Sequence, residues 1–156
     1  MPQKIIIAVD DSENAMRAVR QVAETFGKDT RITIFSVLPD TAMLCDMNSP
    51  ELTPLFRSQQ SSFCQLEDKK RALVTEACRN AKQILVGAGF PESQVEIHTE
   101  VKKKGVARDI VHLAESGYDL IVIGKRGHTG IKEFFMGSVP QKVLQLAKDT
   151  SVLVVN

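Results

Sequence analysis

The sequence predicts an α/β protein built on a single doubly wound parallel sheet of five strands, with helices on both faces. Short β-branched runs alternate with longer stretches of helical periodicity along the whole chain, which is typical of such sheets. The run KIIIAV is apolar throughout, as expected for a strand that is buried on both faces. Right-handed crossovers then restrict the topology to doubly wound forms.

The first strand, helix and second strand follow one another without interruption. Residues 4–9 form the first strand, and residues 11–27 carry apolar side chains at helical spacing. Ser12 is a good N-cap for this helix, and Gly27 is well placed to end it. The β-branched run at residues 31–38 is the second strand.

The periodicity then fails over residues 39–62, which contain three prolines. We expect this irregular insertion to be a loop or a short mobile helix. An amphipathic helix follows at residues 63–89 and ends at a glycine.

The second half completes the alternation. Strands are expected at residues 94–101, 119–124 and 151–155, and helices at residues 106–117 and 138–148. A chain of 156 residues is long enough to bury a substantial core, so we expect one domain covering residues 1–156. Sheets of this kind bind ligands at the carboxyl ends of their strands, where the winding reverses.

The charge balance excludes some classes of protein. There are 20 Lys and Arg against 19 Asp and Glu, a formal net charge of +1 that argues against a nucleic-acid partner. The run Lys102-Lys103-Lys104 is interpreted as a solvated loop. No apolar run is long enough to span a membrane, and the first residues do not resemble a secretory signal. A cytoplasmic location is therefore expected.

The three cysteines form no C-x-x-C pair, and the three histidines are not at the spacing of zinc ligands. We expect the cysteines to be reduced thiols and no metal site to be present. A disulfide between Cys45 and Cys64 is the alternative.

Glycines gather behind the fourth strand. Gly124 and Gly127 lie three residues apart at its carboxyl end, and Gly137 and Ser138 open the next helix. Glycine permits φ > 0 and close approach of a ligand to the backbone. The first N–H groups of a helix lack partners and attract anions, and the Ser138 hydroxyl adds a donor.

Three further side chains, those of Lys125, Arg126 and His128, can add positive charge to this region. The same region shows no paired carboxylate or second base, so His128 is not expected to be catalytic. Together the glycines, the helix start and the charges favour a phosphate-binding site. The alternative is a surface loop in which the glycines only allow turns.

The pattern Gly124-x2-Gly127-x9-Gly137-Ser138 resembles the G-x2-G-x9-G-[S/T] nucleotide-binding motif of the universal stress protein family. The likeness extends over the whole chain. It implies the adenine nucleotide alpha hydrolase-like fold with strand order 3-2-1-4-5, and ATP as the ligand, with Mg²⁺. The cofactor-binding residues that it implies are Asp10, Val37, Gly124, Lys125, Arg126, Gly127, Gly137, Ser138 and Val139.

The position of Asp10 supports this assignment independently. It ends a buried strand at the ligand edge of the sheet, where its carboxylate could accept from an adenine amino group or a ribose hydroxyl. The alternative is that Asp10 or Asp11 only caps the first helix; we assign the cap to Ser12 or Asp11.

The resemblance implies an ATP-binding regulator of the stress response. We expect slow or no hydrolysis, because no general base is evident. Two alternatives stay open: an adenine-nucleotide hydrolase on the same sheet, and a nucleotide-free dimeric scaffold module. The last strand, residues 151–155, would be an exposed edge. Pairing with a second copy would cover it, and the family resemblance implies homodimers formed in this way. A further protein partner is expected, but its identity is not specified.

Overall fold

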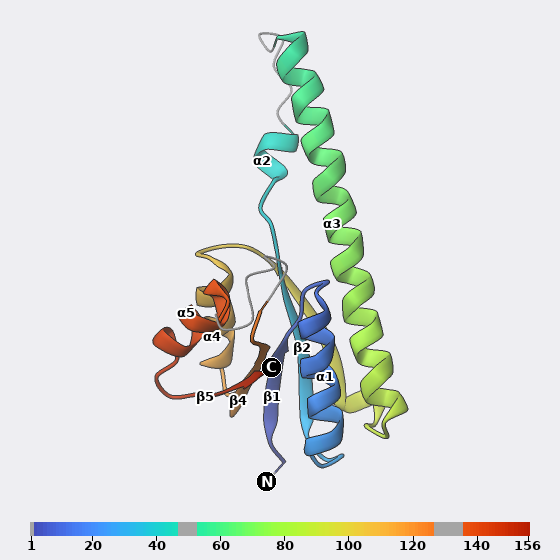
Figure 1. Cartoon of the computed structure of the whole chain (residues 1–156), viewed down its shortest axis with the longest axis vertical. Helices are drawn as coiled ribbons and strands as arrows, with labels where there is room; N and C mark the ends of the chain where they lie inside the picture. The colour runs from blue at the N-terminus through green and yellow to red at the C-terminus, as the bar shows by residue number, and fades with distance from the viewer. Residues whose placement is uncertain (1, 47–52, 127–135) are drawn as a thin grey trace.

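The computed structural model describes residues 2–46, 53–126 and 136–156. In these ranges five parallel strands form one sheet in the order β3-β2-β1-β4-β5, which confirms the predicted fold (Figure 1). The strands are β1 (Lys4–Ala8), β2 (Arg31–Leu38), β3 (Val95–Val101), β4 (Leu120–Gly124) and β5 (Ser151–Val155). The helices are α1 (Glu13–Thr25), α2 (Ala42–Cys45), α3 (Pro54–Gly87), α4 (Val106–Ala114) and α5 (Ser138–Leu146), with a 3-10 turn η1 (Glu92–Gln94).

The sheet is the middle of three layers. Side chains of a strand alternate between its faces, so Ile5 and Ile7 pack against α1 and α3 while Ile6 packs against α4 and α5. All three isoleucines are fully buried. Burial on both faces explains why β1 is apolar without interruption, and it makes β1 the centre of the fold.

α1 begins as the sequence predicts. Ser12 is its N-cap, and the Ser12 Oγ accepts a hydrogen bond from the Ala15 N–H at 3.2 Å. This bond satisfies one of the N–H groups that a helix start leaves without a partner. The assignment of the cap to Ser12 or Asp11 is therefore confirmed for Ser12.

The expectation of a loop or a short helix over residues 39–62 is wrong for the end of that range. The short helix α2 occupies Ala42–Cys45, but α3 begins at Pro54 rather than at residue 63. Proline is compatible with the first turn of a helix, where its missing N–H is not needed, and Thr53 caps the helix by accepting from the Phe56 N–H at 3.2 Å. α3 has 34 residues, about 50 Å of helix, and its first half extends beyond the sheet (Figure 1).

The expectation that all cysteines are reduced thiols is also wrong. Cys45 and Cys64 form a disulfide that joins α2 to α3, while Cys78 is a buried free thiol. Sequence spacing alone did not distinguish these states, because the two cysteines are brought together only by the return of the chain from α2 into α3. Among the described residues, no helix combines the length and the apolar character needed to cross a membrane.

Candidate functional site

A pocket of about 290 Å³ opens at the carboxyl ends of β1, β2 and β4. The chain leaves β1 toward β2 on one side, while β4 pairs with the other side of β1. The pocket therefore lies where the winding of the sheet reverses, the place at which doubly wound sheets bind ligands. Its volume approaches the lower end of the range for small-molecule sites.

One end of the pocket is formed by the start of α5. Gly137 is the N-cap, and its own N–H donates to the Lys125 carbonyl oxygen at 2.8 Å. Ser138 and Val139, which follow it in the first turn, both line the pocket. Because Pro140 has no N–H, the backbone donors of this first turn come from Ser138 and Val139. Two amides, a hydroxyl and the positive end of the helix dipole suit an anionic group.

Gly124 has a different reason to be glycine. A Cβ on Gly124 would lie 2.8 Å from the carbonyl oxygen of Asn14, in the first turn of α1. Neither Gly124 nor Gly137 has a positive φ. Of the two properties of glycine considered from sequence, left-handed backbone is therefore not used at these two positions, and the missing Cβ is: Gly124 lets α1 approach β4, and Gly137 leaves room beside the Lys125 carbonyl and the Pro140 ring.

Asp10 also lines the pocket and is fixed in place. Its Oδ1 accepts a hydrogen bond from the Ser12 N–H at 2.9 Å. Asp10 and Ser12 both line the pocket, so the cap of α1 and the carboxylate form one local structure at the pocket edge. The Asp10 Oδ2 makes no hydrogen bond to any described residue and can accept from a ligand.

Apolar side chains cover the rest of the pocket. Val9 and Val37 come from the ends of β1 and β2, and Val74 comes from α3. Val106 and Ile110, on the first turns of α4, close the same space. An apolar cavity with a carboxylate at its edge and helix amides at one end can hold an aromatic base and a phosphate at the same time.

The residues from α3 and α4 were not predicted as site residues. Val74 and Ile110 read as ordinary core positions of amphipathic helices, so only the spatial arrangement identifies them. A signal for Val106 existed, because a glycine precedes it at a strand-to-helix turn: Gly105 has φ +133° and is the N-cap of α4.

Asp109 holds that turn together. Its carboxylate is buried and accepts from the Lys103 N–H at 2.8 Å and from the Lys104 N–H at 3.1 Å. The lysine run is thus fixed at its backbone while its side chains are exposed, which agrees with the expected solvated loop. The position of Val106 in the pocket depends on this arrangement.

The predicted site residues are brought together with two exceptions. Asp10, Val37, Gly124, Arg126, Gly137, Ser138 and Val139 line the pocket. Lys125 does not line it and contributes through its backbone, which accepts from Gly137 and donates to the Val155 carbonyl oxygen at 2.7 Å. Gly127 lies outside the described residues, as does His128. Within the described ranges, no group of histidines, cysteines and carboxylates is placed to hold a metal ion.

Comparison with known proteins places the chain in one family. The model of the universal stress protein family matches residues 1–156. The universal stress protein YxiE of Bacillus subtilis is 26% identical over 148 residues, which cover 94% of this chain and 95% of that protein. A putative universal stress protein of Staphylococcus aureus is 25% identical over 146 residues, covering 93% of this chain and 79% of that protein.

Solved structures give the same result for the fold. The hypothetical protein MJ0577 has a TM-score of 0.64 at 26% identity, with 99% of this chain and 96% of that chain covered. A universal stress protein from Archaeoglobus fulgidus has a TM-score of 0.70 at 23% identity, and both chains are covered completely. A universal stress protein solved in complex with cAMP has a TM-score of 0.64 at 22% identity, covering 99% of this chain and 97% of that chain.

Proposed function

The chain belongs to the universal stress protein family, and we propose that it is an ATP-binding member, a small cytoplasmic regulator of the stress response. The observation that carries this proposal is the pocket itself. It combines the two backbone donors at the start of α5 with apolar walls and the carboxylate of Asp10.

In this proposal, each part of ATP is assigned to one part of the pocket. The phosphates would lie against the Ser138 and Val139 amides, with Arg126 at the same end. The adenine would lie between the valines of β1, β2 and α4, and Asp10 would accept from the base or the ribose. The solved complex of a related protein with cAMP supports an adenine nucleotide as the ligand class.

Bound Mg²⁺ would be held by the phosphates and water, since metal ions of this kind are commonly carried by the nucleotide. It would neutralise charge on the phosphates. The described part of the site offers no pair of groups arranged to activate water, so hydrolysis is proposed to be slow or absent.

The experiment is to denature the purified protein and identify any released small molecule by mass. Thermal unfolding with added Mg·ATP, Mg·ADP, cAMP and GTP then ranks the ligands. ATP at 100 times its dissociation constant should stabilise the fold by about 2.7 kcal/mol. No released nucleotide and no stabilisation by any of the four would favour the scaffold alternative. Turnover above about one per second with Mg²⁺ would favour the hydrolase alternative.

We also propose a homodimer through β5. This strand is an edge of the sheet, with β4 as its neighbour, and Val152, Leu153 and Val154 are only half-buried. A second copy would pair with the open edge and cover these side chains. The mass in solution, measured by light scattering after size exclusion, tests this proposal; a monomer at micromolar concentration would contradict it.

A further inference from the structure

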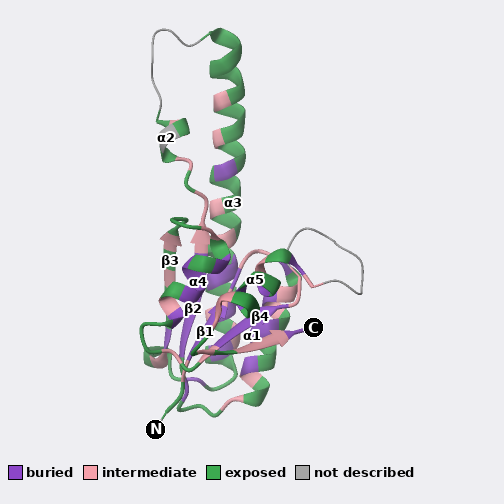
Figure 2. Ribbon diagram, turned by 90° about the vertical axis from the view of Figure 1, so that its left-hand side faces the viewer, coloured by how far each residue is buried: buried purple, intermediate pink, exposed green. Residues whose placement is uncertain are grey.

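The first half of α3 carries a bare apolar face. Leu55, Leu66 and Leu73 are 70%, 60% and 54% exposed, and Phe56 and Phe63 are also exposed. Residues three, four and seven apart share a helix face, so these five side chains form one stripe, which we call the α3 stripe. Leu55 and Leu73 are about 27 Å apart along the helix. Figure 2 shows the first half of α3 projecting from the body. Single exposed apolar side chains are common on protein surfaces, but a row of five large ones indicates an interaction site.

A neighbouring face of the same helix already has a partner. The Gln60 side chain donates to the Leu44 carbonyl oxygen, Cys64 is disulfide-bonded to Cys45, and Arg71 donates to the Pro39 carbonyl oxygen at 2.8 Å. The segment around α2 is therefore held beside the α3 stripe and leaves the stripe exposed. The covering partner must come from outside the described part of this chain.

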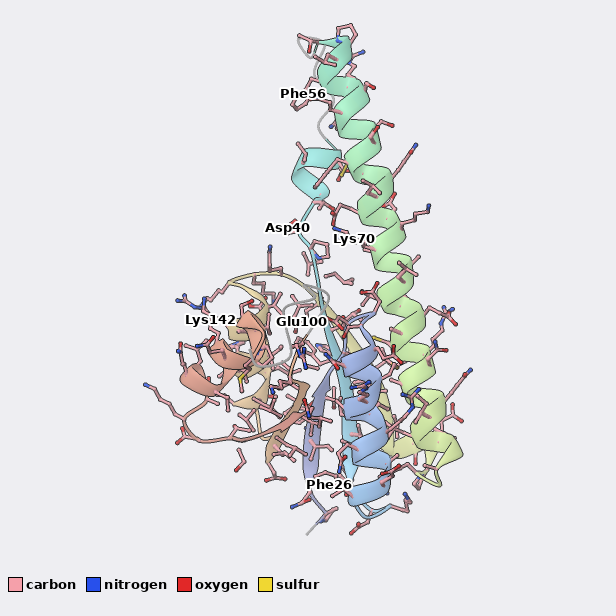
Figure 3. All side chains as sticks on the ribbon, in the orientation of Figure 1. Phe26, Asp40, Phe56, Lys70, Glu100 and Lys142 are labelled. Carbon is pink, nitrogen blue, oxygen red and sulfur yellow. A yellow bond between two sulfur atoms is a disulfide. The ribbon has the colours of Figure 1, made fainter. Side chains whose placement is uncertain are left out.

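We propose that the α3 stripe binds the α3 stripe of a second copy of this chain, with the two helices antiparallel. Phe56, Phe63, Leu66 and Leu73 follow the spacing at which paired helices place their contact residues, seven or three residues apart. Gln59 and Lys70 occupy the two remaining contact positions between Phe56 and Leu73. Figure 3 shows Phe56 near the outer end of α3 and Lys70 further toward the sheet.

The positions of these two polar residues select one register. When the two-fold axis passes between Cys64 and Gln65, Phe56 lies opposite the second copy's Leu73 and Phe63 lies opposite its Leu66. Gln59 then lies opposite Lys70, so polar residues meet only each other. A shift of seven residues in either direction places a polar side chain against an apolar one, against Phe63 or Leu66, and is less favourable.

The charge at Lys70 favours antiparallel over parallel pairing. In a parallel pair with aligned sequences, Lys70 would lie opposite the Lys70 of the second copy, and like charges would meet inside the contact. In the antiparallel register each lysine faces a glutamine. In this register Pro54 of one copy lies level with Thr75 of the other. The buried residues of α3 become frequent only from Ala77 onward, so the contact between the two helices ends where the body begins.

The first experiment uses the full chain and measures mass in solution by light scattering after size exclusion. Leu66→Glu should halve the mass of the assembly at a concentration at which the unaltered protein is assembled through α3. Ala72→Glu is the matched control, since Ala72 is exposed on the opposite side of the same helix and should leave the mass unchanged. Circular dichroism must show equal helix content in both variants. An unchanged mass for Leu66→Glu would overturn the proposal and leave the stripe to a different partner.

The second experiment tests direction and register. Gln59→Glu should tighten the association about tenfold at low salt, because each new carboxylate faces the Lys70 of the second copy. Gln59→Lys should weaken it by a similar factor, and adding Lys70→Glu to Gln59→Lys should restore it. In a parallel pair Gln59→Glu would weaken the association instead, because the two new carboxylates would face each other. That result would overturn the antiparallel arrangement. Pairing through β5 is unaffected by these substitutions, so the two contacts are tested separately.

Discussion

Asp10 lines the pocket, and one of its carboxylate oxygens accepts from the Ser12 N–H, which holds the carboxylate in place. Of the two roles weighed for Asp10 from sequence, the helix cap is taken by Ser12, and the ligand contact is the role that we propose. The Asp10 carboxylate stabilises the turn before α1, and its second oxygen is available to a ligand.

We expect Asp10→Ala to lower the affinity for ATP at least tenfold and to lower the affinity for inorganic triphosphate much less. The reason is that the carboxylate is placed to accept from the base or the sugar, and a hydrogen bond to a charged group is strong when it is desolvated. Isothermal titration with both ligands measures the difference. Asp10→Asn is the control for the turn, since its side-chain oxygen can still accept from Ser12. Equal losses for ATP and triphosphate would show that Asp10 does not contact the nucleoside.

The two described glycines of the motif should respond differently to substitution. Gly124→Ala forces a Cβ to 2.8 Å from the Asn14 carbonyl oxygen and should cost about 1–3 kcal/mol of unfolding free energy. A Cβ on Gly137 meets its nearest neighbour, the Lys125 carbonyl oxygen, at an ordinary 3.4 Å. Gly137→Val should therefore cost less unfolding free energy than Gly124→Ala, but it should prevent ATP binding because its methyl groups extend further at the pocket edge. Urea unfolding without ligand and an ATP titration separate the two effects; a Gly124→Ala variant as stable as the parent would contradict the packing role.

Cys78 makes the unfolding free energy depend on pH in the alkaline range. Burial raises the pKa of the Cys78 thiol from 9.0 to about 11, so the unfolded chain loses this proton at lower pH than the folded one. Below pH 9 the thiol is protonated in both states and contributes no pH dependence. Between pH 9 and 11 stability falls as pH rises. Between pH 8 and pH 10 the unfolding free energy of the parent should fall by about 1.4 kcal/mol more than that of Cys78→Ala. Urea unfolding at the two pH values measures the difference. Parallel pH profiles for the two proteins would contradict this.

Among the elements, the strands could be predicted from their β-branched runs, most clearly β1 and β4, where burial on both faces leaves a strong apolar signal. The strand order was implied by the family resemblance. The start of α3 could not be predicted, because Pro54 interrupts the sequence pattern although it occupies a position where helices accept proline. The contribution of α4 to the site was missed for a related reason. Val106 and Ile110 look like core residues, and only the fold shows that they face a cavity.

The turn into α4 should be sensitive to Asp109. Asp109→Ala removes the acceptor of the Lys103 and Lys104 N–H groups and should cost about 1–3 kcal/mol of unfolding free energy. Because Val106 lines the pocket directly after this turn, the same substitution should also lower the affinity for ATP. Asp109→Asn keeps one oxygen acceptor and should fall between the parent and the alanine variant in both measurements. Full retention of ATP affinity in Asp109→Ala would show that the turn does not shape the pocket.

At the scale of the whole molecule, the chain combines a body around the sheet with a projecting part made of α2 and the first half of α3 (Figure 1). The body contains most of the buried side chains, whereas in the projecting part of the described structure burial is sparse (Figure 2). The family resemblance predicted the body and its site, because the motif and the apolar strands belong to it. It gave no information about the projecting part, where the sequence lacks a regular period before α3.

The disulfide should stabilise the projecting part without stabilising the body. Cys45 and Cys64 are 19 residues apart. Closing a loop of that size lowers the conformational entropy of the opened chain, which stabilises the closed form by roughly 3 kcal/mol. Because few buried contacts hold this part, reduction should open it locally while the sheet stays folded. Limited proteolysis followed by mass spectrometry should show faster cleavage between residues 39 and 73 after reduction, and equally fast cleavage in Cys64→Ser without reductant. ATP binding to the body should persist in both cases. Cys78→Ala, which retains the disulfide, is the control and should be cleaved in this region like the parent; a cleavage pattern that does not change on reduction would contradict the prediction.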